Sequence, residues 1–420
     1  MNPDCEDSEQ RRFWYKDVPT KTCSTCEGEA PIEYAYVDTC LDTGKIINRY
    51  CPPDRVKLHK KYIKGEEPTV ACGFHKKPDP PIPEPCKPYL GAGLYDLRRF
   101  SDEQIEAVIK KLHEAGGNAL ELFLIWGWPL AKRKPWHSYP SSGWRFTPYK
   151  LLPDEFWSEP KFGDYKFPMF DLDTWNNETW RKYRLIFSLC EKYGIAVFLR
   201  IEDFCSLKDP FYNRHNPHSK GSNVQSYHGG TWGEGIWPWN MRLNRKIIKT
   251  VNEAELKHIF YVKMNEADIL LGENDTEEWG DKTLIEYHQR FVDDFLSLGV
   301  KKEQMIMNIH RDKPRKHFEN LGYMIEWHWI ASPESMKKRY ADSGINIFCN
   351  GDGAKDGLGG TSFAGYTQPS FLQGEKMGRY QAEIDGFGYS SLIHKYEQGP
   401  ESNIDLVDFN FIKGMKKGIG

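Results

Sequence analysis

Apolar runs alternate with amphipathic segments along the chain after residue 88. Eight runs have the length of a strand, and none shows the strict two-residue alternation of a sheet with one solvated face. They are residues 89–96, 118–128, 195–203, 258–266, 304–310, 323–329, 345–353 and 389–399. Helical spacing of apolar residues is found at 101–117, 175–194 and 282–299, with further helical segments near 332–343 and 370–385. This order predicts an α/β fold with a parallel sheet.

Eight buried strands that alternate with helices favour a closed (β/α)8 TIM barrel. An open, doubly wound sheet is the alternative arrangement. No G-x-G-x-x-G or G-x-x-x-x-G-K-[ST] motif follows any of the strands, so nucleotide binding at a glycine-rich loop has little support. The prediction is therefore a TIM barrel over residues 89–420, without a cofactor.

Cysteine marks a separate N-terminal segment. Seven of the ten cysteines lie among the first 86 residues, a density typical of a small cross-linked module. Disulfides are one interpretation, with a pairing that the sequence does not give. The pairs "CSTC" (23–26) and "CGFH" (72–75) could instead hold one tetrahedral zinc ion, and free thiols are the third possibility. We place a Cys-rich module, stabilised by disulfides or zinc, at residues 1–75.

The stretch "KKPDPPIPEPCKP" (76–88) is predicted to be a linker, because repeated proline fixes an extended chain and removes hydrogen-bond donors. The formal net charge of −3 offers no basic field for nucleic acid. No apolar stretch reaches the roughly 18 residues of a membrane helix, and the acidic start lacks the pattern of a secretion signal. We therefore expect no nucleic acid partner and no membrane span, and any export would use another route.

Polar side chains stand at the carboxyl end of nearly every predicted strand. In a TIM barrel these ends meet at one mouth, where the loops converge and the chemistry takes place. Charged or amide groups at so many ends would be costly in a barrel built only for stability, so the pattern predicts a functional cleft. The residues are Tyr95, Asp96, Trp126, Trp128, Arg200, Glu202, Asp203, Asn265, Glu266, Asn308, His310, Glu326, His328, Asn350, Asp352, Tyr396 and Glu397.

Indole rings are frequent in the segments between the predicted strands. The chain has 14 tryptophans, and several lie in "WPLAKRKPWHSYPSSGWRF" (128–146) and "YHGGTWGEGIWPWN" (227–240), which includes Trp237. A loop offers limited burial, whereas a rim of rings can stack on sugar faces. A self-packed aromatic cluster is the alternative interpretation.

Two resemblances to known families add to this picture. Residues 40–75 carry C-x-D-T-G-K, Y-C-P and K-G-x-E-P-T-x-x-C elements and resemble a segment near the C-terminus of some bifunctional penicillin-binding proteins. This resemblance implies a cell-surface setting rather than transpeptidase chemistry.

The second resemblance covers roughly residues 89–400 and is to the clan A retaining glycoside hydrolases, a TIM-barrel superfamily. It is carried by "IKKLHEAGGNALELFLIW", by "FDLDTWNNETWRKYRLIFSLCEKYGIAVFLRI" and by "VKMNEADI", which matches the Asn-Glu pair at the end of strand four in that clan. The resemblance implies that Glu266 is the general acid/base and that Asn265 binds the sugar 2-hydroxyl. A retaining hydrolase needs one carboxyl that gives and later takes a proton, and a second that attacks the anomeric carbon.

The second carboxylate departs from the family pattern. The clan has a glutamate at the end of strand seven, where this chain has "FCNGDG" with Asp352, one methylene shorter. Glu397 on strand eight and Glu326 on strand six are the alternatives. A separation of about 5 Å from Glu266 would fit retention of configuration, whereas roughly 6.5–9.5 Å would indicate inversion through a water molecule.

Supporting roles at the mouth follow from position along the strands. Arg200 and Glu202 are candidates for fixing carboxylate charge and hydroxyl orientation, although a buried Arg-Glu pair is equally ordinary. Histidines at the strand ends could hydrogen-bond the nucleophile or the substrate, and indoles could form sugar platforms. These candidates are His310, His328, Trp126, Trp128, Trp327 and Trp329.

The sequence therefore predicts a hydrolase of β-linked polysaccharide or glycoside, located outside the cell, at the cell surface or on a virion, with the N-terminal module attaching it to an assembly partner. The alternative is a catalytically inactive barrel that binds carbohydrate or serves as a structural component of such an assembly. A metal-dependent hydrolase is a third possibility, and its ligands would be Asp96, His310, His328 and His394.

Overall fold

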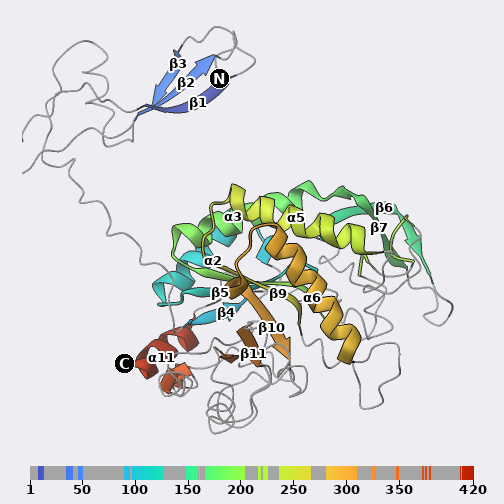
Figure 1. Cartoon of the computed structure of the whole chain (residues 1–420). Helices are drawn as coiled ribbons and strands as arrows, with labels where there is room; N and C mark the ends of the chain where they lie inside the picture. The colour runs from blue at the N-terminus through green and yellow to red at the C-terminus, as the bar shows by residue number, and fades with distance from the viewer. Residues whose placement is uncertain are drawn as a thin grey trace, which may run out of the picture. The chain divides into compact units, whose positions relative to one another are not determined.

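The computed structural model divides the chain into two compact units, residues 1–81 and 82–420. It describes residues 8–13, 35–40, 46–50, 89–94, 97–125, 147–158, 160, 166–203, 216–218, 221–225, 236–265, 281–309, 324–327, 347–349, 371–372, 374–375, 378–379, 407 and 409–420 (Figure 1). The predicted linker at 76–88 lies outside these ranges.

The first unit contains a three-stranded antiparallel sheet. Its strands are β1 (Ser8–Phe13), β2 (Ala35–Cys40) and β3 (Ile46–Tyr50), in the order β1-β2-β3. The predictions of disulfides or zinc fall on side chains outside the described part of this unit.

The second unit is built on a parallel sheet of seven described strands. Each strand pairs with the next strand of this sheet along the chain, in the order β12-β11-β10-β9-β8-β5-β4. The strands are β4 (Gly91–Gly93), β5 (Ala119–Phe123), β8 (Ala196–Asp203), β9 (Ile259–Asn265), β10 (Met305–Ile309), β11 (Met324–Trp327) and β12 (Ile347–Cys349). The α/β class and the parallel pairing are thus as predicted.

The strand order distinguishes between the two predicted arrangements. A doubly wound sheet reverses its order at a switch point, with the first strand inside the sheet. Among the described strands, β4 and β12 come first and last, and the order runs between them without reversal, as it does around a TIM barrel. The eighth strand, predicted at 389–399, lies outside the described residues, so closure of the barrel stays a prediction.

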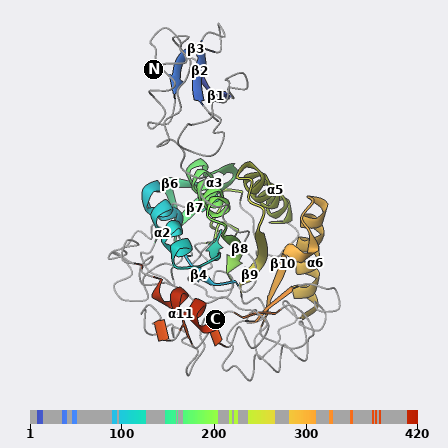
Figure 2. The same ribbon diagram turned by 90° about the vertical axis from the view of Figure 1, so that its left-hand side faces the viewer.

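Amphipathic helices cover the sheet (Figures 1 and 2). They are α2 (Asp102–Glu114), α3 (Asn177–Lys192), α5 (Trp237–Glu253), α6 (Asp281–Ser297) and α11 (Asn410–Ile419). Ser101 is the N-cap of α2, because its hydroxyl accepts from the Gln104 N–H at 3.2 Å and the Gln104 side chain accepts from the Ser101 N–H. Past the end of α2, Gly116 has a φ of 88°, a backbone conformation that favours glycine.

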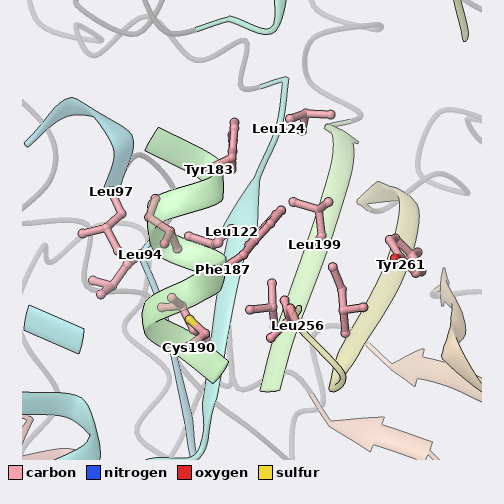
Figure 3. Close-up of a cluster of buried hydrophobic side chains, with 14 of the residues drawn as sticks. Leu94, Leu97, Leu122, Leu124, Tyr183, Phe187, Cys190, Leu199, Leu256 and Tyr261 are labelled. Atoms are coloured by element: carbon pink, nitrogen blue, oxygen red, sulfur yellow. The ribbon is translucent and has the colours of Figure 1, made fainter. Parts of the chain in front are cut away.

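The main core lies between the strands and the helices. Leu122 and Leu199 project from β5 and β8 into the cluster that contains Tyr183, Phe187 and Cys190 of α3 (Figure 3). A smaller cluster occupies the other face of the sheet, the side that would be the barrel interior. It consists of Tyr89, Ala119, Ala196, Phe198, Val262 and Ile306, with Phe260 packed against it.

Two segments differ from their predicted structure. Residues 149–157 and 167–175 form an antiparallel hairpin of β6 (Tyr149–Trp157) and β7 (Phe167–Trp175), so Trp175 ends a strand instead of starting the helix predicted at 175–194. Residues 237–240, assigned above to a long loop, form the first turn of α5. Pro238 lies in this first turn, where proline is well accommodated because the N–H groups there have no partner within the helix.

The C-terminal helix α11 makes an unusually close crossing with the helical residues around 371–379. A Cβ added at Gly374 or Gly378 would overlap a backbone carbonyl of α11, and one added at Gly414 or Gly418 would overlap a carbonyl of the 371–379 segment. The contacts advance in the same direction along both segments, so the two run parallel. The Lys416 side chain lies against Gly116, which places α11 beside the end of α2.

Candidate active site

The inner face of the sheet changes from apolar to polar toward the carboxyl ends of its strands. Because side chains alternate along a strand, Glu121, Arg200 and Asn308 share a face with Ala119, Phe198 and Ile306, each two positions further on. All three polar residues are buried. The charged layer thus lies above an apolar floor, on the side where TIM barrels carry their chemistry.

Arg200 of β8 and Glu121 of β5 form a buried ion pair on this face. The Arg200 Nε donates to the Glu121 Oε1, and the two side chains are 0% and 1% exposed. The guanidinium carbon also lies 5.8 Å from the centroid of the Phe123 ring. Charges without contact to water need such pairing, since an isolated one costs several kcal/mol.

A second buried network joins the ends of β8 and β9. The Glu202 Oε1 lies 3.0 Å from the His218 Nδ1, and its Oε2 lies 3.3 Å from the Lys263 Nζ. The Lys263 Nζ in turn donates to the Asn240 Oδ1 of α5 at 3.2 Å. The side chains of Glu202, His218 and Lys263 are all fully buried. The Glu202 carboxylate thus contacts donors from different parts of the chain.

Tyr149 completes this network from β6. Its hydroxyl lies 2.8 Å from the His218 Nε2. If His218 is neutral with its proton on Nδ1, it donates to Glu202 and accepts from the Tyr149 hydroxyl, so every contact has one donor and one acceptor. His218 thereby connects the loop after β8 to the hairpin that follows β5.

The charge states follow from burial and from the neighbouring charges. Burial pushes the pKa of the Glu202 carboxyl up, but the Lys263 charge and the hydrogen bond from His218 push it further down, so the net shift is downward. Burial lowers the pKa of His218, and this outweighs the opposing effect of Glu202. Near neutral pH the network therefore holds an ionised Glu202 and a neutral His218.

Acid is expected to destabilise the second unit through His218. Its pKa is lowered in the folded state, so below about pH 6.5 the unfolded chain takes up a proton that the folded protein does not. The folded state therefore loses stability relative to the unfolded chain as the pH falls from about 6.5 toward the lower pKa that His218 has in the folded protein. Wild type should lose more of its thermal stability between pH 7.5 and 5.5 than His218→Gln, whose midpoint is lower but less dependent on pH.

Tyr149→Phe is the matched control for this comparison. It removes one hydrogen bond and leaves the imidazole buried, so a pH dependence like that of wild type is expected. Thermal melts of the three proteins at each pH provide the measurement. An undiminished pH dependence in His218→Gln would contradict the assignment of the effect to this histidine.

The β6–β7 hairpin and residues 221–225 pack together next to this network. The Phe170 N–H donates to the Ser222 carbonyl at 2.9 Å, and the Val224 N–H donates to the Phe170 carbonyl at 3.0 Å. Tyr149 stacks on Trp175, with 5.3 Å between the ring centroids. The insertions after β5 and β8 are therefore joined to each other and, through His218, to the end of β8.

The predicted site residues are only partly within the described chain. Asn265 ends β9, Glu326 lies opposite Asn308 in the backbone register of β10 and β11, and Trp327 ends β11. Trp237 begins α5 and is half-buried, with the Arg290 guanidinium 4.3 Å from its ring centroid. Outside the described residues lie Glu266, Asp352, Glu397, His310, His328, Trp126, Trp128, Trp329, and the metal candidates Asp96 and His394.

Three residues at this end of the sheet were missed by the sequence analysis: Glu121, His218 and Lys263. Glu121 interrupts "ALELF" and Lys263 interrupts "HIFYVKM", and a charge inside an apolar strand signals a buried partner. No comparable signal existed for His218, which comes from an irregular segment. Among the described residues, no group of three or more His, Cys, Asp or Glu side chains could hold a metal ion, and no helix is long and apolar enough to cross a membrane.

Comparisons with known proteins give likenesses of structure alone. No protein-family profile matches the chain, and neither does any curated protein. A putative glycoside hydrolase from Bacteroides vulgatus is 10% identical with a TM-score of 0.48, over 92% of this chain and 71% of the other. An exo-β-N-acetylglucosaminidase from Vibrio harveyi is 15% identical (TM-score 0.47; 80% of this chain, 55% of the other), and an endo-1,4-β-mannanase from Rhizomucor miehei is 10% identical (0.46; 78% and 95%). We assign no activity from these likenesses.

Proposed function

We propose that the second unit is a glycoside hydrolase that acts on a β-linked polysaccharide or glycoside. The observation that carries this proposal is the polar layer on the inner face of the sheet, next to the point where β9 ends in Asn265 and the chain continues with Glu266. A parallel sheet with this strand order brings the carboxyl ends of its strands to one edge, where groups from several strands can act on one substrate.

Glu266 is the proposed general acid/base. Val262 belongs to the inner-face cluster and Met264 lies two positions further on, so continued alternation would direct position 266 to the same face. A carboxyl there can protonate the glycosidic oxygen and later take a proton from water. Asn265 is proposed to bind the sugar 2-hydroxyl.

The second carboxylate is proposed to be Asp352, with Glu397 and Glu326 as alternatives. Support for Glu326 is its register position opposite the buried Asn308. Support for Asp352 is its place three residues after β12, the seventh strand of the sheet. For the first unit we propose a role in attachment outside the cell or at a surface, where its cysteines could be oxidised.

A screen of soluble β-glycans with wild type and Glu266→Gln tests the proposal. Wild type should release reducing ends, and Glu266→Gln should be at least about 100-fold slower, because general acid/base catalysis contributes about 10²–10⁴-fold. The control is Glu114→Gln, the same change at an exposed position at the end of α2, which should retain full activity.

The remaining outcomes of the screen are also informative. Binding of a glycan without turnover by wild type would identify a carbohydrate-binding barrel, and neither binding nor turnover would overturn the proposal. Asp352→Asn, Glu326→Gln and Glu397→Gln, assayed in parallel, identify the partner carboxylate. The anomeric form of the first product, followed by NMR, distinguishes retention from inversion.

A further inference from the structure

The ion pair of Lys263 and Glu202 lies at the ends of the two strands next to the proposed acid/base. Glu202 pairs with Met264 in the backbone register of β8 and β9, and Asp203 pairs with Asn265. Lys263 precedes Glu266 by three positions in the chain. Its charge is held close to the point where the described pairing of β8 and β9 ends.

Stability alone is a poor explanation for a pair of this kind. A fully buried ion pair loses its hydration on folding, and replacing such pairs by apolar residues of similar size is often neutral or stabilising. Lys263 also donates to the neutral Asn240 side chain, and an uncharged donor could make that hydrogen bond equally well. The pair is better explained as a contact that holds β8, β9 and α5 in one fixed arrangement.

Among the residues that the structure describes, Lys263 links the end of β9 to three neighbours. Its ammonium contacts Glu202 of β8 and Asn240 of α5, and it lies 5.6 Å from the centroid of the Phe291 ring of α6. Glu202 extends the connection through His218 to Tyr149 of the hairpin. A side chain held from three directions cannot shift along the strand or away from it without breaking a buried contact.

We propose that Lys263 and Glu202 are positioning residues, which fix the end of β9 so that the carboxyl at position 266 meets the glycosidic oxygen. The inference rests on the proposed function. A catalytic group displaced by about 1 Å can lose about 100-fold in rate, so a rigid strand end has a direct kinetic value. The pair would act on the chemical step and not on affinity, since neither side chain is exposed to a ligand.

The test separates positioning from folding with a double variant. Lys263→Met and Glu202→Gln each remove one charge of a fully buried ion pair, so both should lower the melting temperature and kcat. Lys263→Met/Glu202→Gln removes both charges and should regain most of the melting temperature. Its kcat on the glycan found in the screen should remain at least about tenfold below wild type, with KM within about twofold.

Lys192→Met/Glu106→Gln removes an exposed Lys-Glu pair between α3 and α2, and its kcat should equal that of wild type. Recovery of kcat together with the melting temperature in the Lys263/Glu202 double variant would show a purely structural pair. If that variant does not fold, Lys263→Arg keeps the charge but alters its reach, and a kcat equal to wild type would overturn the inference. Inactive wild type would overturn the proposed function and this inference with it.

Discussion

Arg200→Met is expected to lower the free energy of unfolding of the second unit by about 3–5 kcal/mol. The substitution leaves the Glu121 carboxylate at 1% exposure without the guanidinium that donates to it. The cost arises from the remaining buried charge more than from the lost attraction. Urea unfolding followed by tryptophan fluorescence gives the measurement.

Two further variants show whether the charge is the cause. Arg200→Met/Glu121→Gln removes both charges and should recover a large part of the lost stability. Arg184→Met breaks a pair with Glu253 whose side chains are 51% and 37% exposed, and should cost no more than about 1 kcal/mol. If the double variant were as unstable as Arg200→Met, loss of packing and not an uncompensated charge would be responsible.

Gly414→Ala should destabilise the second unit by about 2–3 kcal/mol, and Gly374→Ala by a similar amount. In an ordinary helix alanine is favoured over glycine by up to about 1 kcal/mol, so the expected sign is the reverse of the helix preference. The reason is that a Cβ at Gly414 would overlap the Phe371 carbonyl oxygen, and one at Gly374 would overlap that of Phe411. Backbone cannot rotate away as a side chain can, so the two helices must separate.

Lys413→Ala provides the matched control for the glycine variants. Lys413 is the exposed neighbour of Gly414 on the same helix, and its substitution should change stability by less than about 0.5 kcal/mol. The double variant Gly374→Ala/Gly414→Ala should cost less than the sum of the two, because one separation of the helices relieves both overlaps. A stabilising effect of Gly414→Ala in thermal melts would contradict the close crossing.

The sequence was sufficient for the parallel sheet because its signals are local. Continuous apolar runs predicted β8 and β9 close to their actual bounds, and the helical spacing of apolar residues at 101–117 predicted α2. The strand order then followed, because consecutive strands of a barrel are neighbours.

Other features depend on contacts between distant segments and were not predictable in the same way. The β6–β7 hairpin has a nine-residue gap and irregular pairing, and no tight-turn motif marks it. Trp237 was assigned to a loop although it begins α5. Of the buried network, Glu202 was among the predicted site residues, and Lys263 was missed although it interrupts an apolar run. The role of His218 depends on contacts that exist only in the folded structure.

The place of α11 beside α2 also bears on how the protein is made. Each strand of the sheet pairs with the next one to emerge from the ribosome, so the sheet can grow during synthesis. The apolar side chains of α11, including Phe411 and Met415, belong to the same core as those of α2, yet they are translated long after it. Until then the nascent chain leaves exposed the part of the α2 surface that α11 later covers, and uncovered apolar surface of this kind favours association between incompletely folded chains.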